Sequence, residues 1–146
     1  MQESNRLESY KHLNEECGVF GMYDFDGGDV AESIYYGLVS LQHRGQESAG
    51  IAINDDGVFS SCRDTGLVAE VFSPEKLRIL GEGNIAVGHV RCTTTGGKNH
   101  NNIQPVVIRH MKGNMALCHN RNLINAGSLR SRHELSGAIL PAPFRE

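Results

Sequence analysis

Cys17 has the clearest capacity for covalent chemistry, because it follows two glutamates and opens the apolar stretch CGVFGMY. A thiol attacks as its thiolate, and with an unperturbed pKa of about 8.5 it needs a base at neutral pH. If cleavage made Cys17 the first residue, its own α-amine, with a pKa of about 7.7–8.0, would supply that base. Residues 1–16 would then be a propeptide. The alternative is a small apolar side chain in a buried strand.

Two arginines have the chemistry to bind a small charged substrate. Arg91 follows His89 by two residues in GHVRCTTTGG, so both lie on one face of a strand, ahead of a loop that contains Thr94. A guanidinium binds a carboxylate through two parallel hydrogen bonds, and threonine hydroxyls suit the other polar atoms of a zwitterion. Arg44 precedes Gly45 in LQHRGQ. For Arg91 the alternative is a surface arginine beside a polar loop. For Arg44 the alternative is a basic residue at a helix C-cap, where it meets the helix dipole.

Asn120 follows a strand-like stretch and precedes a predicted helix, in the sequence LCHNRNLINA. A side-chain amide at such a junction can donate a hydrogen bond to an oxyanion. An ordinary turn asparagine is the alternative.

A metal site is disfavoured. The candidate ligands are His89, Cys92, Cys118 and His119, but adjacent strand residues point to opposite faces, so Cys118 and His119 do not easily share a metal ion. The four cysteines contain no C-x-x-C pair, which argues against a zinc ribbon and a disulfide framework. We therefore expect no metal ligands in this chain.

Length and charge limit the classes of protein to which this chain can belong. The chain has 146 residues, enough for one domain, and a formal charge of −3 that indicates no nucleic-acid partner. No apolar run reaches the roughly 18 residues of a membrane helix, and residues 1–16 lack the apolar core of a secretory signal. We expect a cytoplasmic globular domain that binds neither nucleic acid nor membrane.

Hydrophobic periodicity and turn signals predict an α+β fold of layered antiparallel strands and helices. The expected strands span residues 17–23 and 84–91, with hairpins over 49–64 and 104–120. The expected helices span residues 27–45, 73–80 and 125–137. Two prolines within residues 138–146 exclude a central strand there.

Four motifs occur in one order along the chain: NEECGVFG, LQHRGQESAG, GHVR before a threonine-rich glycine loop, and HN-N-LINA. Together they resemble the glutaminase half of the amidophosphoribosyltransferase family, over roughly residues 12–139. The resemblance implies an N-terminal-nucleophile hydrolase, an αββα sandwich. It divides the chain into a propeptide, residues 1–16, and a type 2 glutamine amidotransferase domain, residues 17–146.

The resemblance also implies an activity. Cys17 would attack the side-chain amide of L-glutamine, form a thioester and release ammonia for phosphoribosylamine formation, the first step of de novo purine (IMP) biosynthesis. The freed α-amine of Cys17 would move the proton.

The other roles implied by the resemblance fall on five residues. Asn120 would be the oxyanion-hole donor, and Arg91 would bind the glutamine α-carboxylate. Arg44 would steady the region of the N-terminal cysteine. His89 and Thr94 would line the glutamine pocket.

The sequence departs from the family pattern in two places. HNRN stands where the family has HNGN, so Arg121 replaces a glycine whose N–H is the second oxyanion donor. The chain then ends in LPAPFRE, without the family aspartate that binds the glutamine α-amine. We therefore expect a sandwich truncated at its C-terminus, and a non-catalytic fragment or binding module is the alternative to an active glutaminase.

The resemblance places the remaining family features outside this chain. The phosphoribosyltransferase half is missing, and with it the Mg²⁺ that family members use and the 4Fe–4S cluster that some of them contain. We expect no cofactor in this chain. Family members are homo-oligomers.

Overall fold

The chain forms two antiparallel sheets with helices outside them. The computed structural model describes residues 17–92, 102–120 and 125–136. In chain order the elements are β1 (Gly18–Tyr23), α1 (Ala31–Ser40), the 3-10 helix η1 (Gln42–Arg44), β2 (Ser48–Asp55), β3 (Val58–Thr65), α2 (Val68–Val71), α3 (Pro74–Leu80), β4 (Ile85–Arg91), β5 (Val106–His110), β6 (Gly113–Leu117) and α4 (Ala126–Leu135). The predicted propeptide and the tail after residue 137 lie outside the described residues.

The larger sheet has the strand order β1-β4-β2-β3, and all neighbouring strands are antiparallel. β2 and β3 form a hairpin around Asp56 and Gly57, whose φ angles are +42° and +90°. Positive φ at both central residues is the type I′ geometry that Asp-Gly favours. The predicted hairpin is therefore confirmed.

α1 covers one face of the larger sheet. Ile34 and Leu38, one helical turn apart, are fully buried in the apolar core. A Cβ on Gly88 would lie 2.9 Å from the Leu38 side chain, and one on Gly37 would collide with the Phe20 ring. Glycine at these two positions lets the helix approach the strands closely.

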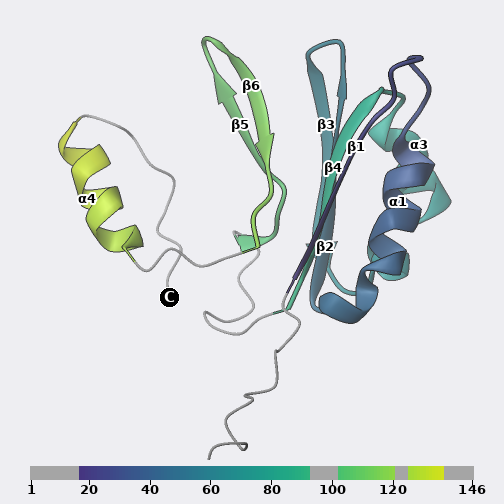
Figure 1. The fold of residues 1–146 in the computed structure, drawn as a ribbon, viewed down its shortest axis with the longest axis horizontal. Helices are drawn as coiled ribbons and strands as arrows, with labels where there is room; N and C mark the ends of the chain where they lie inside the picture. The colour runs from purple at the N-terminus through teal and green to yellow at the C-terminus, as the bar shows by residue number, and fades with distance from the viewer. Residues whose placement is uncertain (1–16, 93–101, 121–124, 137–146) are drawn as a thin grey trace, which may run out of the picture.

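The elements follow one another in space in the order helices, sheet, hairpin, helix (Figure 1). α1 and α3 lie on one side of the larger sheet, the β5–β6 hairpin lies on the other, and α4 lies beyond the hairpin. This helix–sheet–sheet–helix order confirms the predicted α+β class and the αββα arrangement. None of the helices in the described ranges is long and apolar enough to cross a bilayer.

The helix expected over residues 27–45 is shorter in the structure. α1 begins after Asp29, whose Oδ1 accepts a hydrogen bond from the Ala31 N–H at 2.9 Å. The last part of the expected helix forms η1, and Gly45 is extended. A Cβ on Gly45 would lie 2.6 Å from the backbone nitrogen of Arg91, so only glycine fits where η1 meets the end of β4. The short helix α2 was not predicted.

Candidate active site

Cys17 lies immediately before β1, at one end of the larger sheet. Because β1 and β4 are antiparallel, with Gly18 opposite Val90, the start of β1 meets the end of β4. The Cys17 Sγ lies 3.8 Å from the carbonyl oxygen of Cys92, the residue that follows β4. Cys17 is half-buried and has a φ of +59°, which is rare for a residue with a side chain.

Two side chains from distant parts of the chain donate hydrogen bonds to the carbonyl oxygen of Cys17. Arg44 Nε, in η1, lies 2.9 Å from this oxygen. Asn120 Nδ2, after β6, lies 3.4 Å from it, which makes the contact long and weak. The structure thus brings together the three residues that the sequence assigns to nucleophile, support and oxyanion donor. Their roles in a reaction stay predictions.

His89 is buried between the layers, with 1% of its surface exposed. Its Nε2 lies 3.2 Å from the carbonyl oxygen of His119. A carbonyl only accepts, so Nε2 carries the proton and donates it. Burial lowers the pKa of His89 from 6.5 to about 4, although the His119 carbonyl opposes this shift, and the charges of His119 and Arg91 lower the pKa further. The ring is therefore neutral at pH 7.

Gln104 binds the backbone of the same residue, His119. Its Nε2 donates to the His119 carbonyl oxygen at 3.2 Å, and its Oε1 accepts the His119 N–H at 2.6 Å. No motif in the sequence assigns a role to Gln104. Its only local signal is a polar residue between Ile103 and Pro105, both of which are buried.

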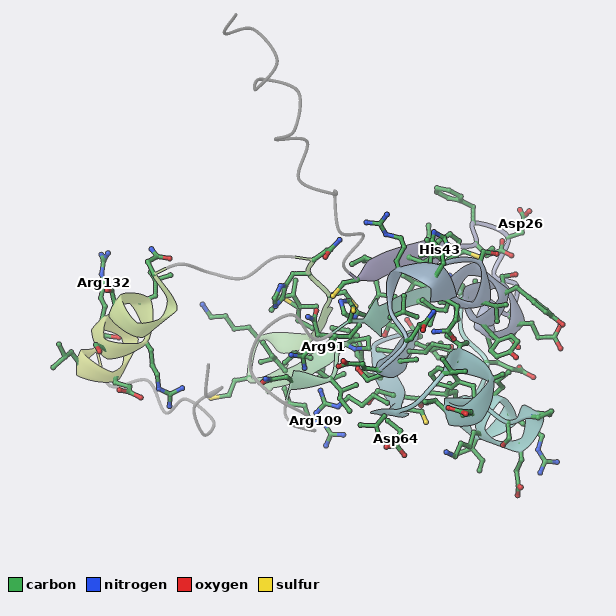
Figure 2. All side chains as sticks on the ribbon, turned by 90° about the horizontal axis from the view of Figure 1, so that it is seen from below. Asp26, His43, Asp64, Arg91, Arg109 and Arg132 are labelled. Atoms are coloured by element: carbon green, nitrogen blue, oxygen red, sulfur yellow. The ribbon has the colours of Figure 1, made fainter. Side chains whose placement is uncertain are left out.

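Arg91 ends β4, two residues after His89 on the same face of the strand. Figure 2 shows Arg91 at the boundary between the larger sheet and the β5–β6 hairpin, far from Arg132 on α4. The predicted pocket residue Thr94 and the departure Arg121 lie outside the described residues. The assignments of His89 and Arg91 to substrate binding stay predictions.

Two other cysteines have thiols whose pKa is raised. Burial raises the pKa of the Cys118 thiol to about 12, and burial also raises the pKa of the Cys62 thiol. Both therefore remain protonated at neutral pH. Within the described ranges, no three His, Cys, Asp or Glu side chains are grouped so that they could hold a metal ion.

Comparison with known proteins identifies sequence relatives along most of the chain. It is 48% identical over 123 residues to the amidophosphoribosyltransferase of Methanocaldococcus jannaschii, and 44% identical over 135 residues to that of Bacillus subtilis. These matches cover 84% and 91% of this chain, but only 26% and 28% of the relatives. The chain thus spans about a quarter of the length of the curated relatives it matches. No family model matches the chain.

Two solved structures share the fold. One is the glutamine phosphoribosylpyrophosphate amidotransferase from Bacillus subtilis complexed with ADP and GMP, with a TM-score of 0.73 and 40% identity. The other, described as the allosteric regulatory enzyme of purine biosynthesis, has a TM-score of 0.75 and 42% identity. Each match covers 84% of this chain and 26% of the solved chain. In sequence and in fold, this chain is homologous to the N-terminal region of amidophosphoribosyltransferases.

Proposed function

We propose that this chain is the glutaminase part of an amidophosphoribosyltransferase, and that it releases ammonia from L-glutamine for the first step of purine biosynthesis. The observation that carries the proposal is the convergence of Arg44 and Asn120 on the carbonyl of Cys17. These residues are far apart in sequence, and the fold brings a hydrogen-bond donor of each type to the residue best suited to attack an amide. The homology to amidophosphoribosyltransferases supports the same activity.

The first chemical step is attack of the Cys17 sulfur on the side-chain carbonyl carbon of glutamine. The α-amine of Cys17, freed by removal of residues 1–16, accepts the thiol proton. The carbonyl oxygen becomes an oxyanion, to which the Asn120 amide donates a hydrogen bond. Arg44 fixes the Cys17 carbonyl, and so the direction in which the nucleophile faces.

In the second step the C–N bond breaks, the protonated α-amine gives its proton to the leaving nitrogen, and ammonia departs. Water then hydrolyses the thioester to glutamate and regenerates the Cys17 thiol. Arg91 binds the α-carboxylate of the substrate through its planar guanidinium, and Thr94 and His89 belong to the glutamine pocket.

The proposal includes partners beyond this chain. A phosphoribosyltransferase domain, in which the Mg²⁺ of the family and the iron–sulfur cluster of some members would be bound, uses the ammonia, and the protein is a homo-oligomer. Location in the cytoplasm belongs to the same proposal, because a reducing compartment keeps a nucleophilic cysteine as a thiol. The described residues provide no grouped ligands for either metal centre.

Intact mass and glutamate release test the proposal together. The active chain should lack residues 1–16, and Cys17→Ala should abolish glutamate release, because no other group provides the nucleophile. Cys62→Ala is the control and should keep the activity, since the Cys62 thiol stays protonated. Full activity in a chain that retains residues 1–16 would contradict the role of the α-amine. Activity in Cys17→Ala would contradict the role of Cys17 as the nucleophile, and no activity in the parent chain would favour the non-catalytic alternative.

A further inference from the structure

The segment that carries Asn120 lies beyond the β5–β6 ladder. The last pair of that ladder is Val106 with Leu117, so the backbone at His119 has no strand partner among the described residues. Backbone groups that lack a strand partner take hydrogen bonds from another source. At His119 this source is two buried side chains.

Gln104 and His89 together form three hydrogen bonds with the His119 backbone. Gln104 binds both its N–H and its carbonyl, at 2.6 and 3.2 Å, and His89 donates to the same carbonyl at 3.2 Å. The exposed fractions are 8% for Gln104 and 1% for His89, so both of these side chains are shielded from water, whereas His119 itself is exposed. We call these two side chains the His119 clamp. Three bonds to one residue fix both its position and its rotation.

The His119 clamp is attached to the larger sheet. Arg63, in β3, donates from Nη1 to the carbonyls of Ile103 (2.7 Å) and Pro105 (3.0 Å), one on each side of Gln104. In β2, Gly50 has no space for a Cβ against the carbonyl of Gln104. The backbone of Gln104 therefore lies directly on the sheet whose first strand follows the proposed nucleophile.

We propose that Gln104 and His89 are positioning residues, which act through the His119 backbone to aim the Asn120 amide at the oxyanion formed on glutamine. This inference rests on the proposed glutaminase function. Because the contact of Asn120 with the Cys17 carbonyl is 3.4 Å long, that contact holds the amide only weakly. The backbone one residue earlier, fixed by the His119 clamp, sets its direction.

Steady-state kinetics of glutamate release provide the first test. Gln104→Met keeps the length of the side chain and removes both of its hydrogen bonds, and Gln104→Glu keeps only the acceptor for the His119 N–H. An oxyanion donor acts mainly in the transition state, so kcat of Gln104→Met should fall about 10–100-fold, with KM for glutamine within about threefold. Gln104→Glu should also lose kcat. A rise in KM with kcat unchanged would overturn the proposal.

A double-mutant cycle tests whether Gln104 acts through Asn120. In an Asn120→Ala background, Gln104→Met should lower kcat by less than about twofold, because the group that it positions is already absent. The control is Asn54→Leu, which also removes a side-chain amide bonded to the backbone, at the Gly57 N–H of the β2–β3 turn. It should leave kcat unchanged in both backgrounds. A Gln104 effect equally large without the Asn120 amide would overturn the proposal.

Hydrogen exchange gives a measurement that does not depend on activity. The His119 amide should exchange at least about tenfold faster in Gln104→Met, whereas Asn54→Leu should leave it unchanged. Unaltered exchange at His119 would overturn the His119 clamp itself. If exchange accelerates but the parent chain releases no glutamate, the clamp stands as structure, and the proposed function and the positioning role are both overturned.

Discussion

At the scale of single residues, Cys17 precedes β1 and has a left-handed conformation, with φ at +59°. Such a conformation costs a residue with a side chain roughly 1–2 kcal/mol. The hydrogen bond from Arg44 to the Cys17 carbonyl holds the residue in place despite this cost. The φ torsion requires a preceding residue. Removal of residues 1–16 would therefore release this strain, which is consistent with the cleavage that the proposed function requires.

His89 predicts a pH dependence of folding stability. Its pKa is about 4 in the folded chain, mainly because of burial, and 6.5 ordinarily, so the unfolded chain binds the extra proton first as pH falls. Stability should therefore be complete above pH 6.5 and decline towards pH 4. Between pH 7 and pH 5 the expected loss from this one residue is about 2 kcal/mol.

Urea denaturation at pH 7 and pH 5 measures this contribution. In His89→Gln the loss between the two pH values should be smaller than in the parent chain by about that amount. Asn54→Leu, which removes a hydrogen bond of the β2–β3 turn and no titratable group, is the control and should keep the parent's pH dependence. Equal pH dependence in the parent and in His89→Gln would show that burial does not control the protonation of His89.

At the scale of elements, the parts that the sequence predicts well are those with short-range signals. Ser73 before Pro74 predicts the start of α3, and the Ser73 Oγ accepts the Lys76 N–H at 3.2 Å. The β2–β3 hairpin follows from its Asp-Gly turn. α2 has only four residues, too few for a helical period, and η1 replaces the last helical turn because Gly45 meets the backbone of β4. These outcomes depend on tertiary packing.

The candidate site was predictable in its residues but not in its contacts. The order of motifs selected Cys17, Arg44 and Asn120, but their meeting depends on strand pairing and on residues up to 103 positions apart. The family resemblance implies that His89 lines the glutamine pocket, whereas among the described residues His89 forms a hydrogen bond with the His119 backbone. A polar side chain that binds the backbone of a distant residue leaves no periodic signal in the sequence.

Gly50 tests the close packing between β2 and the segment that carries Gln104. In Gly50→Ala the new Cβ would collide with the Gln104 carbonyl and lie 2.9 Å from both Arg63 Cβ and Pro105 Cδ. Overpacking of this kind should cost about 1–3 kcal/mol in free energy of unfolding. In Gly21→Ala, in β1 of the same sheet, the new Cβ would have no neighbour closer than 3.9 Å, so this variant should be neutral or slightly stabilising. Urea denaturation of both variants measures the difference, and equal stabilities would contradict this packing.

At the scale of the whole molecule, stability is concentrated on one side of the sandwich. The buried apolar cluster extends from Val30 to Val90 and lies between the larger sheet and the helices α1 to α3. In the β5–β6 hairpin, by contrast, Ile108, Met115 and Leu117 are each more than 40% exposed. The two layers that form the candidate site therefore differ in how much apolar surface they bury.

This asymmetry predicts the order of hydrogen exchange across the chain. β2 and β4 each pair with strands on both sides and border the core, so their amides should exchange slowest. β5 and β6 pair only with each other among the described strands. Their amides should exchange at least about 100-fold faster than those of β2 and β4. This ratio corresponds to a free energy of opening that is roughly 3 kcal/mol lower. Exchange followed by mass spectrometry, at a pH above 6.5 to keep His89 neutral, measures this order. The proposed nucleophile precedes β1 of the larger sheet, and Asn120 follows β6. The site would therefore join a rigid layer to a more mobile one. Uniform protection of the amides in both sheets would contradict this description.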